Sequence, residues 1–243
     1  MRVFAGAAMI ACLGAGGASD RFVYAFTYQS SHTYNAQHAY GVDKMDPGGG
    51  GTFYFHNVNQ HFIAPSANDP QPRAGTIAVD VVGAQSDGGL IVRVSETPAA
   101  VPGERPATCV TYGDTTVVCD PDDPLGPEAG VLLRLFGKGF VDAGRLDAQR
   151  HWNISNVGAP GETDDYRIAG VTGGSLEILE NGTIPANGTS GKTTVNAKIE
   201  YDGARSLPSS VFRSTVEHSR RGAVDETIST QTTLELESSP GIP

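Results

Sequence analysis

Two of the three cysteines are placed to react with each other. Cys109 and Cys119 flank the segment CVTYGDTTVVC, a hairpin pattern with Gly113-Asp114 at its tip. A three-residue loop from Gly113 to Thr115 would set Cys109 directly opposite Cys119, at a β-carbon distance that a disulfide can bridge. We therefore predict a disulfide between them; the alternative is a pair of buried thiols. Zinc is not expected, because two cysteines without nearby histidines do not fill its four positions.

An acidic cluster near the middle of the chain has the oxygen ligands that calcium prefers. Its members are Asp114, Asp120, Asp122, Asp123 and Glu128. Prolines interrupt the cluster and no glycine stands at the turn position, so the spacing departs from that of an EF-hand loop. We interpret Asp122 or Asp123 as the cap of a following helix, because a carboxylate there accepts from the first free N–H groups.

Four of the six histidines lie early in the chain, at His32, His38, His56 and His61. Imidazole is a common ligand of transition metals. However, His56 and His61 would point to opposite faces of a regular strand, and no carboxylate lies within that aromatic segment. Solvent-facing or hydrogen-bonded histidines are the preferred interpretation, and we expect no metal and no cofactor.

The segment Ala186–Thr193, ANGTSGKT, matches a relaxed phosphate-loop pattern. A phosphate loop needs a helix after it, whose N-terminus holds the anion. Residues 194–201 alternate as a strand instead, so we predict a polar hairpin loop. Neither a G-x-S-x-G elbow nor a Ser-x-x-Lys signature is present. A pair of catalytic carboxylates stays open, because the separation that such a pair needs is set in three dimensions.

The charge of the chain argues against nucleic acid as a partner. The formal net charge is −10, and the 17 basic residues are scattered without a run. Such a chain has nothing to neutralise a row of phosphates or an anionic membrane surface. We interpret the excess of acidic residues as a feature that keeps the protein soluble.

The N-terminus has the pattern of an export signal. Arg2 forms a minimal positive region, Val3–Leu13 is small and apolar, and cleavage after Ala18 fits the small residues there. We predict a signal peptide over residues 1–18 and a periplasmic or extracellular protein with no transmembrane segment in its mature part. Lipidation at Cys12 is the alternative.

The segment Gly75–Glu96 predicts the central hairpin of the fold. Apolar residues alternate in both arms, which places one apolar row on one face. Between the arms Asp87-Gly88 suits a two-residue type I′ turn. This turn would pair Val81 with Val94 and Gly83 with Val92.

The rest of the chain reads as strands, with one helix. Pro127 suits a first turn, and an apolar stripe follows at helical spacing over residues 127–137. A strand of unusual length is expected from Val224 to Glu237. Strands this long coil. We predict a mainly β protein, with residues 19–243 as a single domain. Its long, coiled antiparallel sheet would form a half-open barrel or barrel-like structure, with the short amphipathic helix packed on it.

This layout is similar in general to lipid-carrier half-barrels, although no motif assigns the chain to a family. We expect an exported, non-enzymatic protein that binds a hydrophobic small molecule or lipid in the half-barrel interior, or another exported protein. The expected lining residues are Phe22, Tyr24, Phe26, Phe53, Phe55, Leu132 and Phe136. Ordinary core is the alternative role for these aromatic and aliphatic residues. The alternative functions are a secreted hydrolase with a hidden carboxylate pair and a structural or protein-interaction module.

Overall fold

The computed structural model describes the greater part of the chain. The described residues are 20–36, 39–45, 51–56, 71–99, 105–122, 125–137, 139–141, 147, 150–155, 161–185, 190–221 and 224–240. The predicted signal peptide lies outside these residues, as do His38 and His61.

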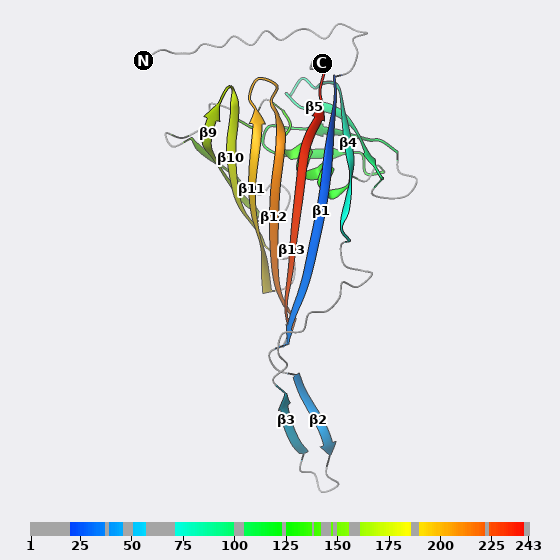
Figure 1. Cartoon of the computed structure of the whole chain (residues 1–243), viewed down its shortest axis with the longest axis vertical. Coiled ribbons are helices and arrows are strands. Elements are labelled where there is room, and N and C mark those ends of the chain that lie inside the picture. Colours follow the sequence, from blue (N-terminus) through cyan, green and yellow to red (C-terminus); the bar gives the residue numbers. More distant parts are fainter. Residues whose placement is uncertain are drawn as a thin grey trace.

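Eleven strands form one antiparallel sheet in the order β7-β6-β5-β4-β1-β13-β12-β11-β10-β9-β8. The strands are β1 (Asp20–Ala36), β4 (Arg73–Ala84), β5 (Leu90–Thr97), β6 (Ala107–Thr111), β7 (Val117–Cys119), β8 (His151–Ser155), β9 (Thr163–Thr172), β10 (Ser175–Pro185), β11 (Ser190–Asp202), β12 (Leu207–Arg221) and β13 (Val224–Ser238). The end strands β7 and β8 do not pair, so the sheet stays open, and its long central strands converge towards one end (Figure 1). The predicted half-open, barrel-like sheet is confirmed.

A second, two-stranded sheet consists of β2 (Ala39–Met45) and β3 (Gly51–His56). It lies beyond the narrow end of the large sheet in Figure 1, away from the helix. Two of the expected lining residues, Phe53 and Phe55, belong to β3, while the other five belong to β1 and to the helical segment.

The long strands β1 and β13 show why one face of the sheet is apolar at one end only. Phe26 pairs with Leu234 and Tyr24 with Leu236, while further along the same face His32 pairs with Ile228. Because side chains alternate between faces, this row changes from aromatic to polar along β1. The apolar core therefore occupies one half of the concave face.

The central hairpin forms, but its predicted register is wrong by one residue next to the turn, where Gly83 pairs with Ile91, and by two residues further along the arms. Val81 pairs with Val92, because the turn shifts the pairing by one residue and the bulge at Val82 shifts it by one more. The turn is also wider than the predicted two residues: Gln85 N donates to Gly89 O, and Gly88 has φ 94°. A slip of two residues keeps every side chain on its face, so the apolar row survives the shift.

The predicted helix is α1 (Pro127–Arg134). Its first residue is the proline, as the sequence indicated, and Gly137 beyond its end has φ 106°. The predicted cap is wrong, because the N-cap is Gly126, which has no side-chain cap bond. Asp122 closes a local turn instead, its N–H donating to the side chain of Asp120. In the part of the chain that the structure describes, no helix has the length and hydropathy of a membrane span.

The predicted cross-link is present at the outer edge of the sheet. Cys109 on β6 pairs in register with Cys119 on β7, and their sulfurs are 2.11 Å apart. Tyr112 N donates to Thr116 O at 2.9 Å, which closes the three-residue loop that the spacing predicted. The disulfide fastens the short edge strand β7 to the sheet.

Candidate functional site

Helix α1 fills the concave face of the open sheet at its apolar end (Figure 1). The Phe136 ring centroid lies 6.0 Å from that of Phe22 and 6.1 Å from that of Tyr24, both on β1. Leu132 and Leu133 of α1 are fully buried in the same cluster. The structure thus brings five of the seven expected lining residues together, as one packed core with α1 in place. Nothing is described for the side chains of Phe53 and Phe55.

The first turn of α1 is tied to one side of the half-barrel by an ionic cluster. Arg73 of β4 pairs with Glu128 of α1 through two of its nitrogens, one of which, Nε, lies 3.0 Å from Glu128 Oε1. Arg73 Nη2 also lies 3.5 Å from Glu96 Oε2 of β5, and its guanidinium carbon lies 5.4 Å from the centre of the Phe26 ring. Both carboxylates are almost fully buried. This N-terminal cluster consists of Arg73, Glu96 and Glu128.

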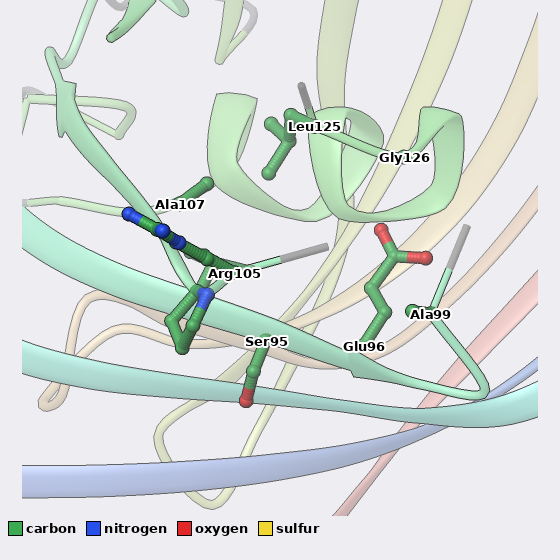
Figure 2. A pocket seen from close by; sticks show the side chains of 9 residues that line it. Ser95, Glu96, Ala99, Arg105, Ala107, Leu125 and Gly126 are labelled. Carbon is green, nitrogen blue, oxygen red and sulfur yellow. The ribbon is translucent and has the colours of Figure 1, made fainter. Parts of the chain in front are cut away.

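A cavity of about 150 Å³ adjoins the N-terminal cluster. Figure 2 shows the Glu96 carboxylate extending from the strand towards Gly126 at the start of the helix, while Arg105 points away from it. A side chain at position 126 would overlap that carboxylate, so the Glu96 side chain would have to move to admit one. A carboxylate beside a helix N-terminus is favourable, because the helix dipole presents positive charge there. Glu96 therefore helps to anchor α1.

The last turn of α1 is tied to the opposite side of the half-barrel. Arg134 Nη2 donates to Glu162 Oε1 at 2.8 Å and to Asp164 Oδ2 of β9 at 3.0 Å. Both acids are buried. Next to them Glu180 Oε1 of β10 lies 3.9 Å from Arg213 Nε of β12. We call these five residues the C-terminal cluster.

Burial sets the protonation behaviour of the C-terminal cluster. Burial raises the pKa of Asp164, and it outweighs the opposing attraction of Arg134. It raises the pKa of Glu180 too, against the attraction of Arg213. Burial lowers the pKa of Arg134, but the attraction of Glu162, Tyr166 and Asp164 together outweighs this effect, and the pKa of Arg134 is raised. The acidic groups around Arg134 therefore stabilise its charge.

Among the described residues, Asp164 and Glu180, whose pKa values are raised, are the carboxylates best suited to acid–base chemistry. A crevice of about 10 Å³ borders them, lined by Val131, Arg134, Leu135, Tyr166, Glu180 and Arg213. A volume of this size holds about one water molecule. A molecule larger than water does not fit in this crevice while α1 is in place.

Neutral hydrogen bonds hold the C-terminal end of α1 as well. Thr111 Oγ1 of β6 donates to Leu133 O at 2.6 Å, and Gly137 N donates to Ser206 O at 3.0 Å. Tyr201 Oη of β11 donates to Gly137 O at 3.1 Å. Burial raises the pKa of Tyr201, so this phenol stays a donor. Polar contacts thus hold α1 to the sheet at its two ends, and apolar packing holds it between them.

Sequence reasoning missed both ionic clusters. Their members stand singly in the chain, and Arg73 lies 55 residues from Glu128. One signal was available: the segment Asp164-Asp165-Tyr166 in β9 alternates, and an acid sharing the face of a buried aromatic is unusual in a strand. An inward-pointing carboxylate needs a charged partner, which the fold supplies from α1.

The other sequence candidates do not assemble into a site. Among the described residues, no group of three or more His, Cys, Asp or Glu side chains is arranged to hold a metal ion. His32 Nε2 instead lies 2.5 Å from Glu226 Oε1. Lys192 and Thr193, the last two residues of the phosphate-loop-like segment, lie within β11, so a strand follows where a nucleotide site needs a helix.

Comparison of the sequence with known protein families and with curated proteins gives no match.

Proposed function

We propose that this protein is a non-enzymatic binding protein that holds an apolar ligand against the concave face of its open sheet. The observation that carries the proposal is that α1 fills this face and is fastened at its two ends by buried ion pairs. The ligand would take the place of α1. The five packed lining residues would then serve as core in one state and as ligand contacts in the other.

The chemistry of the attachment supports release of α1. Buried ion pairs gain little net stability, because each charge loses its hydration when it leaves water. On release, Arg73 and Glu128 would regain that hydration. The helix has only eight residues, and isolated helices of this length are marginal in water. Its order therefore depends on the sheet, and a competing apolar molecule can replace it.

Export to the periplasm or the extracellular medium belongs to the same proposal. The disulfide between Cys109 and Cys119 supports it, because disulfides persist in oxidising compartments. In such a compartment the ligand would be a hydrophobic small molecule or lipid, or an apolar segment of another exported protein.

The test combines native mass spectrometry with dye binding. Protein purified from its exported fraction is weighed before and after solvent extraction, and an extractable excess mass supports the proposal. Uptake of the neutral dye N-phenylnaphthylamine is then compared between wild type and Glu128→Gln. Removing this charge weakens the attachment of α1, so we expect dye affinity to rise several-fold, as for any shift towards a binding-competent state.

Arg21→Gln is the matched control, because Arg21 of β1 is exposed and pairs with Asp80 of β4 on the opposite face of the sheet from Phe22. Its dye affinity should equal that of wild type. No extractable mass, together with no dye uptake by wild type or by a folded Glu128→Gln, would refute the proposal. That result would favour an interaction surface instead.

A further inference from the structure

An aromatic patch on the sheet is covered by a single ring from the segment that follows α1. The Phe140 centroid lies 5.7 Å from that of Trp152, 5.2 Å from that of Tyr166 and 5.4 Å from that of Tyr201. Trp152 and Tyr166 also stack on each other at 5.3 Å. Three different strands, β8, β9 and β11, supply the patch. If Phe140 leaves with α1, the aromatic patch of Trp152, Tyr166 and Tyr201 is uncovered.

Carboxylates border this patch on the same face of the sheet. Asp164 precedes Tyr166 by two residues on β9, and Glu180 is the direct cross-strand partner of Tyr166. With Glu162 they form a set of three buried acids. The sheet itself supplies Arg213 of β12 near Glu180, whereas Arg134 comes from α1. Departure of α1 therefore leaves three acids beside one described arginine.

Departure of the N-terminal end of α1 leaves no such imbalance of charge. When Glu128 departs, Arg73 keeps Glu96 of β5 as its partner. The charge that the sheet lacks without α1 is therefore a positive one, and it is missing at the C-terminal cluster. A ligand with a carboxylate or sulfate head would bring a further negative charge to these acids.

Two buried polar atoms at this place have no hydrogen-bond partner among the described residues. One is Asp164 Oδ1 and the other is Trp152 Nε1. Their residues are 1% and 3% exposed. A buried acceptor without a donor costs free energy, and a ligand that carries an N–H group would satisfy Asp164 Oδ1.

We propose that the ligand class of this site is an apolar molecule with a protonated amine. The inference rests on the proposed function, since it requires α1 and Phe140 to give way. The ammonium takes the place of the Arg134 guanidinium beside Asp164 and Glu162. The apolar body takes the place of Phe140 and the leucines of α1. The faces of the aromatic patch add attraction for a cation.

The chain contains a single tryptophan, Trp152, so its fluorescence reports on the patch directly. Full-length protein is titrated near neutral pH with decylamine, decanol and decyl sulfate, each below its micelle concentration. We expect decylamine to bind about tenfold more tightly than decanol, as a charge-assisted hydrogen bond provides, and decyl sulfate to bind most weakly. Asp164→Asn should remove the preference for the amine, so that decylamine and decanol bind this variant with equal affinity.

Asp165→Asn is the matched control, because this neighbouring carboxylate is half exposed and bonds to Asn153. It should keep the amine preference. Equal binding of all three ligands, or tightest binding of decyl sulfate, would overturn the amine assignment while leaving the proposed function intact. Binding of none of them, by wild type or by Glu128→Gln, would overturn both.

Discussion

Gly182 of β10 lies directly opposite Asp164 of β9, and a side chain at position 182 would overlap the Asp164 carboxylate at Oδ1. The glycine therefore makes room for a buried acid. This acid reaches across the interior to Arg134 and fastens the last turn of α1. One small residue on a strand thus makes room for one of the contacts that anchor the helix.

Gly182→Ala should destabilise the protein by about 1–3 kcal/mol, the usual cost of overpacking a filled site. The new methyl group would also lie 3.2 Å from Val195 Cβ. Urea unfolding measures the free energy of unfolding of each variant. The control is Gly170→Ala, where the nearest atom, Glu177 Cβ, is 3.6 Å away and no cost is expected. If the clash is with Asp164, the Asp164→Ala/Gly182→Ala double variant should lose less stability than the sum of the losses measured for the two single variants.

Phe140→Ala should lower the free energy of unfolding by about 3–5 kcal/mol, because it empties a fully buried site among three rings. The emission of Trp152 should shift as its neighbour disappears. Phe212→Ala is the control, since Phe212 is exposed and should change stability by about 0.5 kcal/mol or less. A small loss for Phe140→Ala would show that the segment after α1 is not part of the cooperative core.

The disulfide should stabilise the fold by about 2–3 kcal/mol, because it closes a short loop in the unfolded chain. The linked cysteines are 10 residues apart. Adding dithiothreitol should lower the urea midpoint of wild type to that of the Cys109→Ala/Cys119→Ala variant. The variant itself should not respond to the reductant. Insensitivity of the wild type would mean that this bond is absent from the purified protein.

Stability should depend on pH through Asp164, whose pKa burial raises above the ordinary 3.8. The folded state then holds this proton more tightly than the unfolded state. The contribution of Asp164 is therefore most favourable below pH 3.8 and falls as pH rises through the raised folded pKa. Asp164→Asn removes this titration, so its stability relative to wild type should improve from acid to neutral pH.

Unfolding in urea at a series of pH values measures this difference. The control is again Asp165→Asn, which should follow wild type in the acid range. A relative stability of Asp164→Asn that declines towards neutral pH would show that the charged form of Asp164 is favoured in the folded protein.

The sequence by itself determined the class of the main elements and the apolar face of the long strand β13. Alternation along β13 placed Leu234 and Leu236 on the interior face, and the spacing of Cys109 and Cys119 determined their pairing. These features are local, since a strand repeats every two residues. The central hairpin shows the limit: its faces were predicted correctly, but the bulge at Val82 moved its register.

Only the tertiary structure decided which charges meet. Arg73 finds Glu128 across 55 residues and Arg134 finds Asp164 across 30. Both contacts depend on how far the long strands coil and on where α1 comes to lie on the concave face. Coiling sums small twists over many strands, and no single residue encodes that sum. The ionic clusters, and the amine site that we infer from them, therefore exist only in the folded sheet.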